Sequence, residues 1–132
     1  CIRDSINLVQ KHKIDGIIAT NTTVSRPETI KSTNKFEEGG LSGKPLGDLS
    51  DKVLKFIAKE TKNELLLIGV GGISSARDIY KKIKLGASLV QLYTALTFNN
   101  LSFLSDVKFQ LSELLKRDNF ATISDAIGID IK

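Results

Sequence analysis

Three short apolar runs of similar design constrain the fold of this chain more than any other feature. They are "IDGIIATNTT" (14–23), "LLLIGVGG" (65–72) and "SLVQLYTA" (88–95), and each ends in small or hydroxyl-bearing residues. Continuous apolar runs of this length are typical of strands in a parallel sheet that is covered on both faces. We therefore expect a parallel sheet at the centre of the fold.

Apolar residues at helical spacing surround these runs. They form four groups: Ile2, Ile6 and Val9; Leu49, Val53, Phe56 and Ile57; Ile79 and Ile83; Leu104, Val107, Leu111 and Leu114. Ser75 with Asp78, and Thr122 with Asp125, have the spacing of residues that cap the start of a helix. The predicted order is helix, strand, helix, strand, helix, strand, helix, which indicates an α/β fold.

Three strands are too few to close a barrel, and an open sheet of three would leave two apolar edges exposed. The chain is therefore either a small three-layer domain or the last three-eighths of a (β/α)8 TIM barrel. It contains no Met, at position 1 or elsewhere, and it opens on "CIRDSINLVQ", which has the pattern of a helix interior. We expect residues 1–132 to be one carboxyl-terminal segment of a longer chain.

Composition excludes several classes of function. The net charge is only +4, aromatic residues make up 6% of the chain, and the 19 basic residues are dispersed. Dispersed lysines, such as those in the run 81–84, are typical of solvated helix faces and do not favour nucleic-acid binding. Cys1 and His12 are the only residues of their kinds, so neither a disulfide framework nor a zinc site is expected, and His12 is predicted at the surface. No apolar run approaches the length of a membrane span.

The second and third runs end in residues that suit an anion. Gly71 and Gly72 end one, and Tyr93 and Thr94 end the other. Parallel strand ends and the start of the next helix, here near Ser75, present backbone N–H groups that glycine leaves accessible. Loops after strands seven and eight commonly bind phosphate in (β/α)8 barrels. We interpret the two strand ends as halves of one phosphate cup; alternatively, the glycines only form a tight turn and Tyr93 packs.

The first run leads to further polar candidates. Asn21 and Thr22 follow it, and an amide side chain there offers the donor and acceptor that an amide or imide ring edge requires. A turn-forming Asn is an equal alternative. Residues 21–48 contain both prolines and four glycines, and so long a loop in a compact domain is often functional. Within it, Ser42 and Gly43 could fold over a ligand or belong to a plain surface loop.

Five blocks of the sequence together resemble class 2 dihydroorotate dehydrogenases, the membrane-associated, quinone-reducing flavoenzymes of pyrimidine synthesis. The blocks are "TNTTVSRP" (20–27), "GGLSGKPL" (39–46), "IGVGGISS" (68–75), "GASLVQLYTALTF" (86–98) and "DAIG" (125–128). They occur in family order and spacing over essentially all 132 residues. The resemblance implies a (β/α)8 barrel with FMN at the carboxyl ends of the strands, of which this chain would supply strands six, seven and eight.

The resemblance also implies roles for single residues. Asn21 and Thr22 would contact the dihydroorotate or orotate ring. Leu96 and Thr97 would lie near the quinone side of the flavin. The implied FMN contacts are Thr22, Ser42, Gly43, Val70, Gly71, Gly72, Tyr93 and Thr94.

In the family, a serine base removes the C5 proton of dihydroorotate while hydride passes from C6 to flavin N5, and ubiquinone reoxidises the flavin. The resemblance puts this serine and the amino-terminal helices that meet the membrane upstream of position 1. No catalytic residue is therefore expected in this chain, which alone should be inactive. The implied partners are dihydroorotate or orotate, ubiquinone and the remainder of the barrel, without nucleic acid. The implied location is peripheral on the inner membrane, bacterial (cytoplasmic side) or mitochondrial.

Three alternatives remain at this point. Another barrel that binds FMN or a sugar phosphate would explain the glycines but not "TNTTVSRP" or "GGLSGKPL". A soluble class 1 dihydroorotate dehydrogenase would share the phosphate cup, but the extended "NTTVSRP" block argues against it. A non-catalytic barrel fragment that acts as a binding module would contain no flavin.

Overall fold

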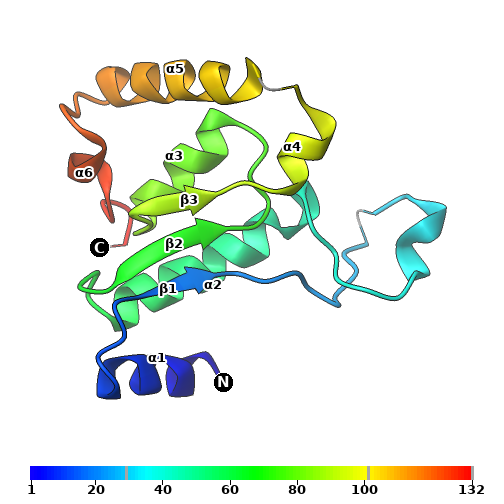
Figure 1. The fold of residues 1–132 in the computed structure, drawn as a ribbon, viewed down its shortest axis with the longest axis horizontal. Coiled ribbons are helices and arrows are strands. Elements are labelled where there is room, and N and C mark those ends of the chain that lie inside the picture. The colour runs from blue at the N-terminus through cyan, green and yellow to red at the C-terminus, as the bar shows by residue number, and fades with distance from the viewer. Residues whose placement is uncertain (29, 101, 132) are drawn as a thin grey trace.

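The computed structural model describes residues 1–28, 30–100 and 102–131; Thr29, Leu101 and Lys132, which belong to the predicted segment 1–132, lie outside the described residues. Helices and strands alternate as the sequence predicts (Figure 1). The order is α1 (Ile2–Lys11), β1 (Gly16–Ala19), the 3-10 helices η1 (Thr33–Phe36) and η2 (Lys44–Leu46), α2 (Gly47–Glu60), β2 (Leu66–Val70), α3 (Ala76–Lys84), β3 (Leu89–Gln91), α4 (Thr94–Phe98), α5 (Ser102–Arg117) and α6 (Ile123–Ala126).

The three strands form one parallel sheet in the order β1-β2-β3. Ile18 pairs with Ile68, which in turn pairs with Leu89, so the strands are in register across the sheet. Each strand is shorter than the apolar run that predicts it, because the small and hydroxyl-bearing residues at the end of each run lie beyond the ladder. The three carboxyl ends therefore meet at one end of the sheet (Figure 1).

Helices α2 and α3 both lie on one face of this sheet, behind it in Figure 1. On the opposite face, Ile18, Leu66 and Leu89 are 58%, 43% and 56% exposed. The expectation of a sheet covered on both faces is thus wrong for the part of the chain that the structure describes. Each strand pairs with the next one along the chain, and right-handed crossovers then place successive helices on the same side. This is how a (β/α)8 barrel is wound, whereas a three-layer domain needs helices on both faces.

Two apolar clusters hold the helices in place. The first lies between α1, α2 and the sheet, and the second joins α3 to α5 and α6. The predicted helical stripes supply five of the buried members, namely Ile6, Ile57, Ile79, Ile83 and Val107. The buried members of the clusters are Ile6, Ala19, Leu54, Ile57, Ala58, Leu67, Leu85 and Ala87 in the first, and Ile73, Ala76, Ile79, Tyr80, Ile83, Val107 and Ala126 in the second.

The start of α2 buries a different face from the one that apolar spacing predicts. Leu49 is 44% exposed, whereas Ser50 and Asp51 are buried. They face Lys82 of α3, which is 1% exposed and whose Nζ lies 2.8 Å from both Ser50 Oγ and Asp51 Oδ1. The expectation that lysines 81–84 lie on a solvated face is therefore wrong for Lys82. A buried charge requires a polar partner from elsewhere in the fold, and local periodicity cannot reveal that partner.

The predicted helix starts have the predicted caps. Ser75 Oγ accepts the Asp78 N–H at 3.3 Å, and the Thr122 N–H donates to Asp125 Oδ2 at 2.7 Å. Helix α5 contains the predicted stripe of Leu104, Val107, Leu111 and Leu114. These local signals fix where α3 and α6 begin.

Candidate active site at the carboxyl ends of the strands

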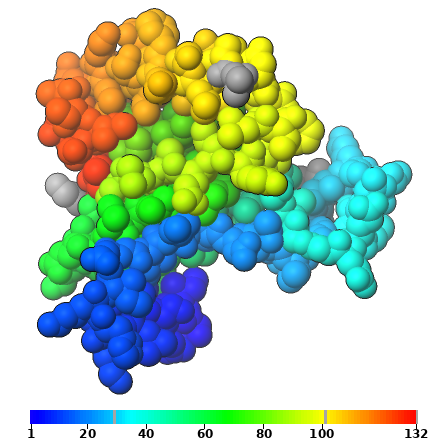
Figure 2. Space-filling model, in the orientation of Figure 1, coloured from blue at the N-terminus to red at the C-terminus, as the bar shows by residue number. Residues whose placement is uncertain are grey.

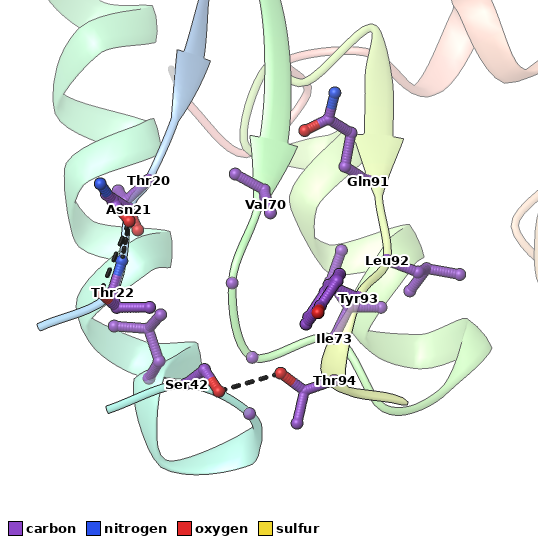
Figure 3. A pocket seen from close by; sticks show the side chains of 14 residues that line it. Thr20, Asn21, Thr22, Ser42, Val70, Ile73, Gln91, Leu92, Tyr93 and Thr94 are labelled. Atoms are coloured by element: carbon purple, nitrogen blue, oxygen red, sulfur yellow. Dashed lines mark hydrogen bonds between the residues drawn. The ribbon is translucent and has the colours of Figure 1, made fainter. Parts of the chain in front are cut away.

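A cavity of about 180 Å³ lies where the three strands end (Figure 3). The residues that follow each strand line it together with the end of the β1–α2 loop, because parallel strands deliver their carboxyl ends to one edge. The lining residues are Thr20, Asn21, Thr22, Ser42, Gly43, Leu46, Val70, Gly71, Gly72, Ile73, Gln91, Leu92, Tyr93 and Thr94.

The structure brings together every residue that the sequence suggests for substrate or FMN. Asn21 and Thr22 lie after β1, and the pair Ser42 and Gly43 lies near the end of the β1–α2 loop. Val70 ends β2, and the others follow β2 or β3. Leu96 and Thr97, expected near the quinone side, lie on α4 outside this lining. Thr97 Oγ1 donates to Thr94 O at 2.7 Å. The roles of all these residues remain predictions.

The loop after β2 depends on its two glycines. Gly71 and Gly72 have φ values of +103° and +74°, a region that other residues rarely adopt. A Cβ on Gly72 would lie 2.1 Å from Gly47 Cα, and one on Gly71 would lie 2.9 Å from Leu46 Cδ2. The loop therefore packs directly against the start of α2, and its backbone, not side chains, lines this side of the cavity. Such a bare backbone is suited to an anion.

The start of α3 contributes less to this cup than the sequence suggests. Ser74 N, Ser74 Oγ and Ser75 Oγ each lie 2.9 Å from Asp78 Oδ2. Burial acts to raise the pKa of Asp78, but the bonds from Ser74 and Ser75 outweigh it and leave that pKa lowered. The helix start is thus capped by its own carboxylate, and the cavity lining on this side ends at Ile73. The cup consists of loop backbone without the helix terminus.

Ser42 and Thr94 join the two sides of the cavity. Thr94 Oγ1 and Ser42 Oγ are 3.0 Å apart, across the opening in Figure 3. Gly43, at φ +75°, brings the loop so close that a Cβ on it would lie 3.2 Å from Thr94 Cγ2. Tyr93, by contrast, is 81% exposed. The alternative that Tyr93 is a packed core residue is therefore wrong for the described chain.

The sequence left two roles open for Asn21, turn formation and ligand binding, and the structure has features of both. Its Oδ1 accepts the Thr22 N–H at 2.7 Å, as a turn-forming Asn does. Its side chain is also exposed and lines the cavity beside Thr22. Local turn formation holds Asn21 at the rim of the cavity without removing it from a ligand's reach.

Five lining residues were not singled out from the sequence: Thr20, Leu46, Ile73, Gln91 and Leu92. Thr20, Ile73 and Leu92 are direct chain neighbours of predicted residues, and Gln91 lies two residues before Tyr93, so the ends of the apolar runs were the available signal. Leu46 has a different origin, since it ends η2 and lies under the glycine loop. Thr20 Oγ1 is buried and has no hydrogen-bond partner among the described residues. An unpartnered buried hydroxyl at a cavity wall suits a polar ligand.

Arg26 was also missed, although it organises the loop between β1 and η2. Its guanidinium donates to backbone carbonyls on both arms of that loop, and five N–H donors in a rigid fork suit such a role. The acceptors within 3.2 Å are Thr23 O, Val24 O, Lys35 O, Glu37 O and Gly39 O. Thr23 and Leu41 add an antiparallel bridge. The loop projects from the body of the molecule (cyan in Figure 2) and returns to the cavity at Ser42.

Within 1–28, 30–100 and 102–131, the structure has no group of three or more His, Cys, Asp or Glu side chains that could hold a metal ion. Among the same residues, every helix is too short or too polar to cross a membrane.

Comparison with known proteins gives consistent matches. A family model described as dihydroorotate dehydrogenase matches residues 2–115. The dihydroorotate dehydrogenase (quinone) of Natronomonas pharaonis is 48% identical over 130 residues, which are 98% of this chain and 37% of that protein. The mitochondrial dihydroorotate dehydrogenase (quinone) of Mus musculus is 49% identical over 127 residues, 96% of this chain and 32% of that protein. The chain thus spans about a third of the length of these relatives.

Solved structures agree with this. The crystal structure of DHODH from Eimeria tenella in complex with ferulenol superposes with a TM-score of 0.94 at 38% identity, covering 98% of this chain and 34% of that one. The ligand-free form from the same organism also gives 0.94. The expected (β/α)8 barrel fold class is thereby confirmed. From the match over residues 2–115 and these relatives, we conclude that the chain belongs to the dihydroorotate dehydrogenase family.

Proposed function

We propose that this chain supplies strands six, seven and eight of a (β/α)8 barrel that oxidises dihydroorotate to orotate in pyrimidine biosynthesis. The electrons would pass through FMN to ubiquinone. The observation that carries the proposal is the cavity at the strand ends, which gathers all nine residues expected to hold FMN and substrate. Family membership, with relatives named as quinone-dependent enzymes, supports the reaction.

The lining suits the phosphate end of FMN. Gly71 and Gly72 present bare backbone, Thr94 presents a hydroxyl, and the Thr20 hydroxyl lacks a partner within the described chain. The volume of about 180 Å³ is well below the roughly 300 Å³ at which complete small-molecule sites begin. These two facts support a partial site, in which this chain holds the phosphate and one edge of the ring system and the rest of the barrel holds the remainder.

Each side of the cavity would have its own task. FMN, when bound, supplies an acceptor for hydride and a carrier of electrons to the quinone. Gly71, Gly72 and the Tyr93–Thr94 segment would bind its phosphate, while Asn21 and Thr22 would orient the pyrimidine ring. The Ser42–Thr94 hydrogen bond would hold the loop over the ligands and exclude water. The proton acceptor would come from the remainder of the barrel, so that residues 1–132 alone bind and orient but do not catalyse.

The quinone and membrane assignments extend the proposal outward from the cavity. Leu96 and Thr97 lie on α4, directly after the phosphate segment, and Leu96 is 40% exposed. Together with Phe98, 83% exposed, they offer an apolar surface that a quinone ring could contact. We place the enzyme peripherally on an inner membrane, attached through parts of the barrel protein other than residues 1–132.

A glycine substitution tests the cup in the full-length protein. Gly72→Ala would force a Cβ to within 2.1 Å of Gly47 Cα, so we expect the purified variant to lose most of its FMN and dihydroorotate oxidation to fall at least tenfold. Gly128→Ala is the matched control, since Gly128 has a similar φ of +73° but lies at the distant carboxyl-terminal end. Equal FMN content in both variants would contradict the proposed cup. FMN retention without dihydroorotate oxidation in the unaltered protein would favour another FMN-binding barrel.

A further inference from the structure

We propose that Lys82, Ser50 and Asp51, here called the Lys82 network, act as positioning residues that set the shape of the phosphate cup from outside the cavity. The inference rests on the proposed function, because it assigns a role toward the phosphate of FMN. None of the three residues lines the cavity. They lie between α2, α3 and the loop after β2, directly behind Gly71 and Gly72.

The geometry of the Lys82 network is fully determined by short contacts. Lys82 Nζ donates to Ser50 Oγ and to Asp51 Oδ1, both at 2.8 Å. Asp51 Oδ2 lies 2.7 Å from Lys81 Nζ, so each carboxylate oxygen has its own cation. The stem of Lys82 packs under β2, where a Cβ on Gly69 would lie 3.1 Å from Lys82 Cδ. The ammonium group is therefore held at one point.

Ser50 connects the Lys82 ammonium group to the phosphate cup. Its Oγ lies 2.9 Å from Gly71 O and 2.8 Å from Gly47 O. Because Lys82 donates to the hydroxyl oxygen, the single hydroxyl hydrogen is directed toward these two carbonyl groups. Gly71 belongs to the cup, and Gly47 is the residue against which Gly72 packs. The buried Ser50 hydroxyl thus bonds to both backbone segments, the loop at Gly71 and the start of α2 at Gly47, where they pack against each other.

Stability alone gives no reason for a charge at this position. A buried ion pair contributes little net stability compared with apolar residues of similar volume, because burial removes both charges from water. What the pair supplies is orientation: Asp51 holds the Lys82 ammonium group, and the ammonium group donates to Ser50 Oγ and so orients the serine hydroxyl. A cup of backbone groups that must fit a phosphate benefits from such a support, because its own glycines have no side chains to fix it.

The test compares FMN with riboflavin, which lacks the phosphate, in the full-length protein. We expect Ser50→Ala to lower the ratio of FMN affinity to riboflavin affinity about tenfold, as one directed hydrogen bond is lost. Lys82→Met should lower the ratio at least as much. Thr61→Val is the matched control, because Thr61 is another buried hydroxyl of the α2 region that donates to a carbonyl, Ile57 O at 2.9 Å, far from the cup. It should reduce thermal stability without changing the ratio.

Each outcome decides something. An unchanged ratio in Ser50→Ala would overturn the positioning role, and this holds even where Lys82→Met fails to fold. A fall of the ratio in Thr61→Val equal to that in Ser50→Ala would also overturn it, since general loosening would then explain the effect. If the unaltered protein binds riboflavin as tightly as FMN, the phosphate cup itself is wrong. The failure of the Lys82 network and the failure of the proposed function are thereby distinguishable.

Discussion

At the residue scale, the Arg26 guanidinium orders the β1–α2 loop by donating hydrogen bonds to backbone carbonyl groups on both of its arms. Arg26→Lys should loosen the loop, because a lysine ammonium is a compact group and cannot reach five carbonyls on both arms. Losing two of these bonds amounts to about 1.5–3 kcal/mol, or roughly tenfold to a hundredfold in the open population. Limited proteolysis of the full-length protein should therefore cleave residues 30–40 at least tenfold faster.

The matched control for this change is Arg3→Lys. Arg3 is an exposed arginine on α1 whose side chain pairs with Glu60 at 3.2 Å, and surface pairs of this kind contribute little. In the Arg3→Lys variant, the rate of cleavage within residues 30–40 should equal that of the unaltered protein. Equal cleavage rates in Arg26→Lys and in the unaltered protein would mean that the loop is ordered by other contacts.

The residues that sequence reasoning found and missed differ in a physical way. Gly71, Gly72 and Tyr93 follow apolar runs, and because strand ends converge in any parallel sheet, their positions along the chain predict their proximity in space. Arg26 and Lys82 follow no such rule. Their partners lie up to 32 residues away, and only the tertiary fold decides which arginine or lysine is drawn inward. The family resemblance pointed to the cavity residues but assigned nothing to these two.

At the scale of elements, a titratable pair joins α3 to the residue that follows α5, Asp118. Tyr80 is buried, and its hydroxyl donates to Asp118 Oδ2 at 2.7 Å. The Arg117 hydrogen bond and then the Tyr80 hydroxyl lower the pKa of Asp118 from 3.8 to about 2. Burial and then the Asp118 bond raise the pKa of Tyr80 from 10.0 to about 12, so it remains protonated at neutral pH.

The sign of the pH effect follows from this shift. Because the folded-state pKa of Asp118 lies below its ordinary value, its contribution to stability is fully present above about pH 4 and is lost as the pH falls toward 2. Tyr80→Phe removes one cause of the lowered pKa. We expect the Tm difference between the unaltered protein and Tyr80→Phe to be larger at pH 6 than at pH 3. A difference that stays constant over this range would contradict the coupling.

The elements themselves were predictable because their signals are local. Ser75 and Thr122 cap helices by contacts within four residues, and α5 follows its own apolar stripe. The expectation of a sheet covered on both faces, which is wrong for the described residues, also has a local cause. An apolar run such as 14–23 shows that a strand is apolar on both sides, but it cannot show whether the second side meets helices or other strands.

At the scale of the whole molecule, the strands are apolar even on the sheet face that no helix covers in the described chain. Ile18, Leu66 and Leu89 alternate with the residues that pack against the helices, and they are exposed in the described chain. In a (β/α)8 barrel the side chains on this face fill the interior, packed in layers from alternate strands. The chain spans 32–37% of its named relatives, about the share that three strand–helix units of eight would represent. The proposed barrel thus accounts for both the exposed sheet face and the small volume of the cavity.

The measurement that tests this account most directly is the flavin absorbance of the purified full-length protein under anaerobic conditions, before and after addition of dihydroorotate. We predict a yellow protein whose flavin band bleaches on adding dihydroorotate and returns on adding a ubiquinone analogue. A colourless protein, or a flavin band that dihydroorotate leaves unchanged, would contradict the proposed function.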